Sequence, residues 1–221
     1  MPTAFFREQR RLMVSQQLEA RGITDPRVLD AMRTVPRHLF VPESHRAQSY
    51  EDCPLPIGHG QTISQPYIVG LMLEALELTG QENVLEVGTG SGYQAALLGL
   101  LAHQVYTVEI LPELTHRAQE LLSELGYENI QVRVANGSIG WKAAAPYNAI
   151  IVAAAAPSIP RSLFDQLADG GKLVVPVGDL HAQDLLRVQN QHGKLIRTNL
   201  GPCAFVPLVG EEGWKSGIGT S

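Results

Sequence analysis

Cysteine is scarce in this sequence. Cys53 and Cys203 are the two cysteines among 221 residues. Two cysteines cannot form the disulfide framework of a small secreted domain, and they are too few for a zinc site built on cysteine. His38 and His45 have no third potential ligand nearby in the sequence, so we predict no metal site.

The sequence also lacks runs of positive charge and long hydrophobic stretches. Lysine and arginine never run beyond the pair Arg10-Arg11, and the net charge is −5, so we expect no binding to nucleic acid. No window approaches the roughly 18 apolar residues of a membrane-spanning helix, and the first residues lack the apolar core of a signal peptide. We therefore expect a cytoplasmic, monomeric protein whose partner is a peptide or a small molecule.

The rest of the composition is that of a globular protein. Apolar residues make up 44% of the chain and charged residues 18%, so the body of the chain is not expected to be disordered. The length suits one domain with a small appendage. We predict N-terminal helices with a substrate-binding loop over 1–80, a ligand-binding α/β domain over 81–210 and a flexible tail over 211–221.

Strands alternate with helices along most of the chain. Hydrophobic periodicity predicts helices over 7–21, 26–35, 66–79, 91–102, 112–125 and 160–168. Strands are predicted over 84–87, 105–108, 130–134, 149–152 and 173–175, followed by a hairpin of 184–190 with 194–200. This alternation predicts an α/β fold: a mostly parallel open sheet with helices on both faces, an antiparallel hairpin at one edge and an N-terminal helical extension.

Residues 36–66 interrupt this pattern. They contain five prolines and show little periodicity, so we predict about thirty residues without regular structure. Such a long irregular stretch is uncommon in a compact domain and is often functional.

A glycine-rich turn follows the first strand of the α/β region. Its residues are Gly88, Thr89, Gly90, Ser91 and Gly92. Alternate glycines allow a sharp turn and a close approach of the backbone to a ligand at the N-terminus of the next helix. A dinucleotide site prefers glycine or alanine at the sixth place of this motif. Tyr93 stands there, which disfavours a pyrophosphate site and hence a nicotinamide-dependent dehydrogenase.

Two carboxylates accompany the turn. Glu109 ends the second strand, 21 residues after Gly88, where a carboxylate can accept hydrogen bonds from both ribose hydroxyls of a nucleoside cofactor. Glu86 lies inside an apolar strand and needs a partner there. It either accepts a structural hydrogen bond from a backbone N–H or contacts the amino-acid end of the cofactor.

Several segments resemble one family. They are PLPIGHGQTISQP (54–66), VLEVGTGSGYQAALL (84–98), YNAIIVAAAAPSIP (147–160), GGKLVVPVG (170–178) and FVPL (205–208). Together they resemble the protein-L-isoaspartate O-methyltransferases, which have a Rossmann-like class I methyltransferase fold. The resemblance runs from about residue 7 to about residue 210.

The resemblance implies a protein-repair methyltransferase. Such an enzyme transfers a methyl group from S-adenosylmethionine to the α-carboxylate of an L-isoaspartyl residue in a damaged peptide or protein, leaving S-adenosylhomocysteine. The family places its active-site serine at Ser64, although this residue is also close enough to Pro66 to cap the next helix. Thr62 is a second hydroxyl for the substrate carboxylate. Gln61 either binds the peptide backbone or stabilises its own loop. The late segment Val206, Pro207 and Leu208 is predicted to line the peptide cleft, to pack on the core, or both.

The sequence departs from the family at two places. Asn136-Gly137 stands where the family commonly has an acidic residue and glycine against the adenine; the Asn136 oxygen remains an acceptor, so we expect weaker cofactor binding without loss of activity. Asn148 stands where aspartate is frequent. The alternatives are a methyltransferase for another carboxylate or a small molecule, and a binding module without turnover.

Overall fold

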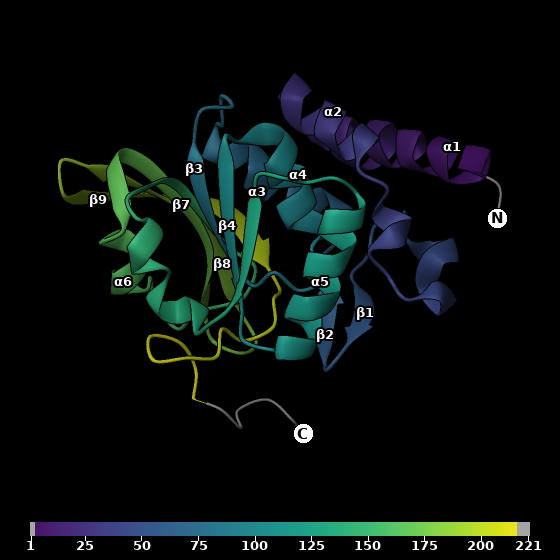
Figure 1. Ribbon diagram of the computed structural model, residues 1–221. Helices are drawn as coiled ribbons and strands as arrows, with labels where there is room; N and C mark the ends of the chain where they lie inside the picture. Colours follow the sequence, from purple (N-terminus) through teal and green to yellow (C-terminus); the bar gives the residue numbers. More distant parts are fainter. Residues whose placement is uncertain (1–2, 216–221) are drawn as a thin grey trace.

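The computed structural model describes residues 3–215, and its centre is a sheet of seven strands (Figure 1). The strands are β3 (Asn83–Val87), β4 (Gln104–Glu109), β5 (Ile130–Val134), β6 (Tyr147–Val152), β7 (Leu167–Gly178), β8 (Gln183–Gln191) and β9 (Lys194–Cys203). Their order across the sheet is β5-β4-β3-β6-β7-β8-β9.

The sheet is parallel except at one edge. Strands β5, β4, β3, β6 and β7 run parallel, whereas β8 and β9 form the predicted antiparallel hairpin. The chain moves outward from β3 to β5 and then returns to place β6 on the other side of β3. This reversal leaves a crevice beyond the carboxyl ends of β3 and β6, where ligands of open α/β sheets bind.

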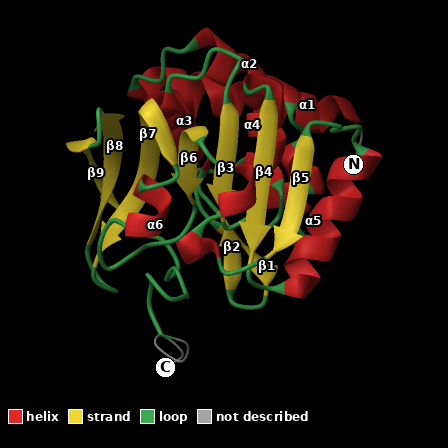
Figure 2. Cartoon of the chain, turned by 60° about the vertical axis from the view of Figure 1, so that its left-hand side comes forward, coloured by secondary structure: helices red, strands yellow, loops and turns green. Residues whose placement is uncertain are grey.

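Helices cover both faces of the sheet unequally (Figure 2). One face carries α1 (Thr3–Met13), α2 (Pro26–Thr34), α3 (Pro66–Leu76), α4 (Tyr93–Leu101) and α5 (Pro112–Glu124). The other face carries the short α6 (Arg161–Phe164) and the turns Gly137–Ile139 and Lys142–Ala144. Neighbouring strand residues such as Val84 and Leu85 pack into opposite cores, which explains the continuous apolar runs of the central strands. The predicted fold class is confirmed.

Local signals fix most helix ends. The Asp25 carboxylate accepts a hydrogen bond from the Arg27 N–H at 2.8 Å, with Pro26 in the first turn of α2. The first helix continues through a π-helical turn (Val14–Leu18) and a 3-10 turn (Glu19–Arg21) to Gly22, whose φ of 93° requires glycine. Helix α3 ends at Leu76, before the predicted Thr79-Gly80.

The prediction of a helix over 160–168 was wrong in its second half. Helix α6 ends at Phe164, and β7 begins at Leu167. The Gln166 carbonyl accepts a hydrogen bond from the N–H of Tyr147 at 2.9 Å, so the backbone has already joined the sheet there. Pairing with β6 therefore overrides the helical pattern.

The prediction that 36–66 lacks regular structure was also wrong. The segment contains 3-10 turns at Arg37–Leu39 and Glu43–Gln48 and a hairpin of β1 (Leu55–Gly58) with β2 (Gln61–Ile63). The hairpin turns at Gly58-His59-Gly60, all with positive φ. Its strands are too short for a clear alternation, yet they bury Leu55, Ile57 and Ile63 against the core. Ser64 directly follows the second strand of this hairpin, so the hairpin determines where Ser64 lies.

The expected N-terminal part (1–80) and the expected α/β domain (81–210) share one hydrophobic core. Phe6 of α1 and Leu185 of β8 belong to the same cluster of buried side chains. Residues 211–215, expected within a flexible tail, are held by hydrogen bonds of Glu212 and Trp214, and the rest of that tail lies outside the described residues. Within residues 3–215, no helix is long and apolar enough to cross a bilayer.

Candidate active site

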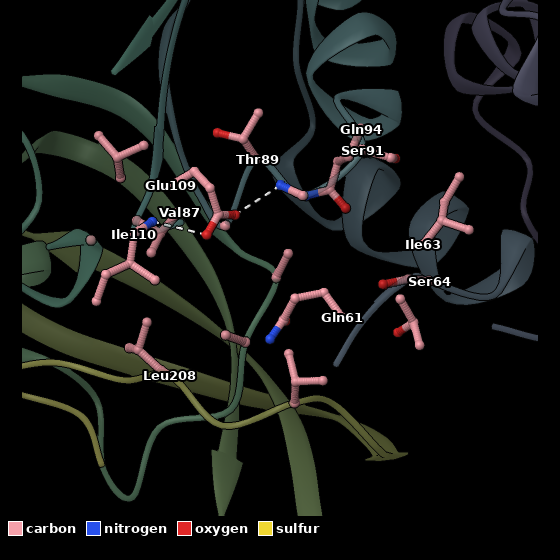
Figure 3. A pocket seen from close by; sticks show the side chains of 18 of the residues that line it. Gln61, Ile63, Ser64, Val87, Thr89, Ser91, Gln94, Glu109, Ile110 and Leu208 are labelled. Carbon is pink, nitrogen blue, oxygen red and sulfur yellow. Dashed lines mark hydrogen bonds between the residues drawn. The ribbon is translucent and has the colours of Figure 1, made fainter. Parts of the chain in front are cut away.

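A pocket lies beyond the carboxyl ends of β3, β4 and β6 (Figure 3). It holds about 850 Å³ of unfilled space, part of it open to solvent, which is within the usual range for small-molecule sites. Twelve of the fifteen predicted site residues line it: Gln61, Thr62, Ser64, Gly88, Thr89, Gly90, Ser91, Glu109, Gly137, Val206, Pro207 and Leu208. The structure does not bring Glu86, Gly92 or Asn136 to the wall.

The glycine turn forms the floor of the pocket. Gly88, Gly90 and Gly92 have φ of 94°, 52° and 86°, respectively, a region that side chains disfavour. On the opposite side, a Cβ on Gly137 would lie 2.5 Å from a Val87 methyl carbon. Glycine therefore permits the left-handed backbone of the turn and lets the backbone at Gly137 pack directly on Val87.

The Glu109 carboxylate faces the turn. It accepts hydrogen bonds from the N–H groups of Gly90 at 2.9 Å, Ile110 at 2.9 Å and Leu111 at 3.1 Å. Its side chain is 7% exposed and lines the pocket. Because an ionised carboxylate has about four acceptor sites, it keeps capacity for a ligand hydroxyl while it holds the glycine turn.

Glu86 lies behind the wall and is fully buried. It accepts a hydrogen bond from the Thr107 hydroxyl at 2.5 Å, and the Thr107 and Thr89 hydroxyls are 2.6 Å apart. The expected backbone N–H partner is absent within residues 3–215, and Glu86 Oε1 has no partner there either. A chain of hydrogen bonds thus connects Glu86 to Thr107 and Thr107 to Thr89, and Thr89 lies on the pocket wall.

Ser64 follows β2 and faces the pocket from the side opposite Glu109. The residue before Pro66 that caps α3 is Gln65, without a side-chain hydrogen bond, so Ser64 does not take the alternative role of helix cap. Within residues 3–215 the Ser64 hydroxyl has no hydrogen-bond partner, while its carbonyl accepts one from Arg37. Gln61 and Thr62 lie on the same strand and the same wall. The hairpin therefore presents free polar groups to a ligand.

The C-terminal segment closes the other side of the pocket. The Val206 carbonyl accepts from the Ala155 N–H, and the Leu208 N–H donates to the Ala155 carbonyl, both at 2.8 Å. Further along, the Trp214 indole donates to the same carbonyl at 3.1 Å, and the Glu212 carboxylate accepts from the Ser162 N–H at 2.9 Å. These contacts fix Val206–Leu208 in front of β6.

The Asn136 side chain forms hydrogen bonds within its own turn. Its side-chain oxygen accepts hydrogen bonds from the N–H of Ser138 at 3.1 Å and from the Ser138 hydroxyl at 2.9 Å. The side chain therefore caps the 3-10 turn that begins at Gly137, and Gly137 rather than Asn136 lines the pocket.

Comparison with known proteins decides the family. A sequence model of the protein-L-isoaspartate(D-aspartate) O-methyltransferase family matches residues 8–213. The chain belongs to this family. The predicted resemblance is confirmed, and with it the enzyme class.

Two bacterial relatives illustrate the similarity. The protein-L-isoaspartate O-methyltransferase 1 of Syntrophobacter fumaroxidans is 56% identical over 210 residues, covering 95% of this chain and 98% of that protein. The protein-L-isoaspartate O-methyltransferase of Syntrophus aciditrophicus is 52% identical over 213 residues, and the match covers 95% of this chain and 98% of that protein.

Solved structures agree. One protein-L-isoaspartate O-methyltransferase superimposes with a TM-score of 0.83 at 26% identity, over 92% of this chain and 66% of that chain. A second, a putative enzyme of this type from Plasmodium falciparum in complex with S-adenosyl-L-homocysteine, gives a TM-score of 0.78 at 27% identity, over 91% and 98% of the two chains.

The pocket of this protein-L-isoaspartate O-methyltransferase fits the family's cofactor, S-adenosylmethionine. Sequence reasoning missed one polar wall residue, Gln94, which is 7% exposed and whose amide nitrogen has no hydrogen-bond partner within residues 3–215. A buried donor without a partner is costly, and a ligand oxygen would satisfy it. Of the other missed residues, Tyr93 donates its hydroxyl to the Met32 sulfur at 3.6 Å, and the rest, including Ile110, Ala153 and Ala154, are apolar. Their position directly after β4 and β6 is the signal that could have found them.

Glu86 gives this methyltransferase a pH-dependent stability. Burial raises the pKa of Glu86 to about 8. The hydrogen bond from Thr107 lowers this pKa, and the nearby charge of Glu109 raises it. In the unfolded chain the pKa is about 4.3, so between these values the folded state holds the extra proton, and stability falls as pH rises. We expect Glu86→Gln to raise the melting temperature relative to the native protein more at pH 8 than at pH 5. Exposed Glu128→Gln is the control; an equal difference at both pH values would contradict the assignment.

Proposed function

We propose that this chain methylates the α-carboxylate of L-isoaspartyl residues in damaged peptides and proteins, with S-adenosylmethionine as the methyl donor. One observation carries the proposal at the level of residues. The unpartnered Ser64 hydroxyl and the Glu109 carboxylate face a single pocket from opposite sides. One side is suited to a nucleoside and the other to a carboxylate.

The glycine turn and Glu109 are the proposed cofactor side. Glu109 would accept a hydrogen bond from a ribose hydroxyl at its remaining acceptor site, and the backbone of Gly88–Gly90 would lie against the amino-acid portion. The Gly137 backbone would lie against the base, and Gln94 would supply an N–H donor. Glu86 and Gly92 support this side from behind the wall. When bound, S-adenosylmethionine supplies an electrophilic methyl group on a sulfonium sulfur.

The hairpin and the C-terminal segment are the proposed peptide side. Ser64 and Thr62 would donate hydrogen bonds to the substrate carboxylate, and Gln61 would bind the peptide backbone. Val206, Pro207 and Leu208 would cover the peptide and exclude water. A carboxylate is ionised at pH 7 because its reference pKa is about 3.5–4, so no general base is required. The residues then act by aligning the reacting groups.

A labelling experiment tests this function. The protein is incubated with methyl-labelled S-adenosylmethionine and a matched pair of peptides, one isoaspartyl and one aspartyl. We expect base-labile label on the isoaspartyl peptide alone. Label on neither peptide, with cofactor binding intact, would instead favour a methyltransferase for another acceptor.

We also propose that one chain forms a complete active site, in which residues 1–80 supply the hairpin of the peptide side and 81–210 supply the cofactor side together with the late segment Val206–Leu208 that covers the peptide. Gln61, Thr62 and Ser64 line the same pocket as Gly88 and Glu109, so this chain supplies both sides of the site, and we propose a monomer on that ground. A reducing, cytoplasmic compartment is supported by the two free cysteines. Light scattering at working enzyme concentration measures the oligomeric state.

The Asn136→Asp substitution tests the departure from the family pattern. The present oxygen is used by Ser138; aspartate would keep that cap, and its negative charge directly behind Gly137 would attract the adenine amine. We expect the dissociation constant of S-adenosylhomocysteine to fall by up to about fivefold, because a charged acceptor adds about 1 kcal/mol over a neutral one and 1.4 kcal/mol is a factor of ten in affinity. Calorimetric titration measures it, and a large loss of affinity would contradict the proposed position of the base.

A further inference from the structure

Arg37 is an unusual residue for the interior of this protein. It opens the 3-10 turn Arg37–Leu39, and its side chain is 0% exposed. Within residues 3–215 no aspartate or glutamate forms an ion pair with it, and its Nη1 has no hydrogen-bond partner. A buried charge without a counter-ion is costly, so its contacts need an explanation.

Two backbone carbonyls receive the guanidinium. Nε donates to the Ser49 carbonyl and Nη2 donates to the Ser64 carbonyl, each at 2.7 Å. Such charge-assisted hydrogen bonds are stronger than neutral ones. The planar guanidinium reaches both carbonyls at once, which a lysine ammonium does less well.

The ring of Tyr93 completes the environment. The guanidinium carbon is 4.9 Å from its centroid, within the range of cation–π attraction. Tyr93 is the first residue of α4, directly after the glycine turn, and it lines the pocket. Arg37 therefore links the start of the 36–66 segment, the end of the β1–β2 hairpin and the helix that begins at the cofactor side.

The contact with Ser64 fixes the backbone and leaves the side chain free. The carbonyl of Ser64 is held from the core, whereas the hydroxyl faces the pocket without a partner within the described residues. The anchored carbonyl group is bonded directly to the Cα of Ser64. It therefore restricts the position of the Cα and of the hydroxyl that this residue carries. Within residues 3–215, Arg37 is the one donor to this carbonyl, which lies directly after β2.

We propose that Arg37 is a positioning residue that holds Ser64 in place for the substrate carboxylate. This inference rests on the proposed function, in which Ser64 binds that carboxylate. Arg37 itself does not line the pocket, so it acts through Ser64. Because a displacement of about 1 Å can cost on the order of 100-fold in rate, removing the guanidinium lowers kcat/KM for an isoaspartyl peptide. The affinity for S-adenosylhomocysteine stays nearly the same.

A double-mutant cycle separates positioning from simple loss of stability. Arg37→Met keeps an unbranched apolar stem in the core, removes the guanidinium and so removes both hydrogen bonds. We expect it to lower kcat/KM for the isoaspartyl peptide by roughly 10- to 100-fold in the native background, and by less than about threefold in the Ser64→Ala background. A structural role alone would give the same loss in both backgrounds.

Arg27 offers a matched control. Its guanidinium also donates to two backbone carbonyls, those of Leu78 at 2.7 Å and Leu101 at 2.9 Å, and does so at the opposite end of the sheet from the pocket. Arg27→Met is expected to lower the melting temperature and to leave kcat/KM unchanged at a temperature where the variant is folded.

The outcomes distinguish this inference from the proposed function. An inactive native enzyme would contradict the proposed function itself. If the native enzyme is active but Ser64→Ala leaves kcat/KM unchanged, the positioning role is overturned and the proposed function stands. The same holds if Arg37→Met lowers kcat/KM equally in the native and Ser64→Ala backgrounds. If Arg37→Met does not fold, Arg37→Lys replaces it in the same cycle. Lysine retains the buried charge and one of the two contacts, so a smaller but still Ser64-dependent loss is expected.

Discussion

Glu109→Ala is expected to weaken the binding of S-adenosylmethionine by about 10- to 150-fold for each ribose hydroxyl that loses its acceptor. A hydrogen bond to a charged group contributes about 1.5–3 kcal/mol, and 1.4 kcal/mol is a factor of ten in affinity. The carboxylate also holds the N–H of Gly90 at 2.9 Å. Alanine therefore removes the ligand's acceptor and one contact that shapes the glycine turn.

Two further variants separate these effects. Glu109→Gln keeps one acceptor oxygen for the backbone and loses the charge, so we expect an intermediate affinity with the turn preserved. Glu113→Ala removes an exposed acid in the first turn of α5 and controls for the general change in charge. Affinity is measured by calorimetric titration with S-adenosylhomocysteine. An unchanged dissociation constant in Glu109→Ala would remove Glu109 from the cofactor site.

The parts of the site that follow a regular pattern were predictable from the sequence. Strand β3, the glycine turn and Glu109 are read from local signals: an apolar run, alternate glycines and an acid at the end of the next strand. Parallel strands bring their carboxyl ends to the same edge, so residues far apart in the sequence could be placed together. The order of the strands then determines where the pocket lies.

The parts that depend on tertiary contacts were not predictable. Strands β1 and β2 are four and three residues long, too short to show a period, and they are stabilised by packing against the core. The Asn136 side chain was expected to face a ligand, but Ser138 is close enough to take its oxygen. Arg37 reads as an ordinary surface residue in the sequence, and its burial follows only from the fold.

Ser64→Ala is expected to lower kcat/KM for an isoaspartyl peptide by about 10- to 150-fold and to leave cofactor affinity unchanged. The hydroxyl would lose one hydrogen bond to an ionised carboxylate, about 1.5–3 kcal/mol. The backbone contact of Ser64 with Arg37 at 2.7 Å is made by the carbonyl, which alanine keeps. The melting temperature should therefore remain close to that of the native protein.

The way in which the loss divides between kcat and KM identifies what the hydroxyl does. A rise in KM alone would mean that Ser64 binds the carboxylate equally in the ground state and in the transition state, whereas a fall in kcat would mean that it aligns the carboxylate for attack. Ser123→Ala removes an exposed hydroxyl from α5 and should change neither constant. If Ser64→Ala weakens cofactor binding as strongly as it slows methylation, the residue supports the pocket as a whole and Thr62 becomes the leading donor to the substrate carboxylate.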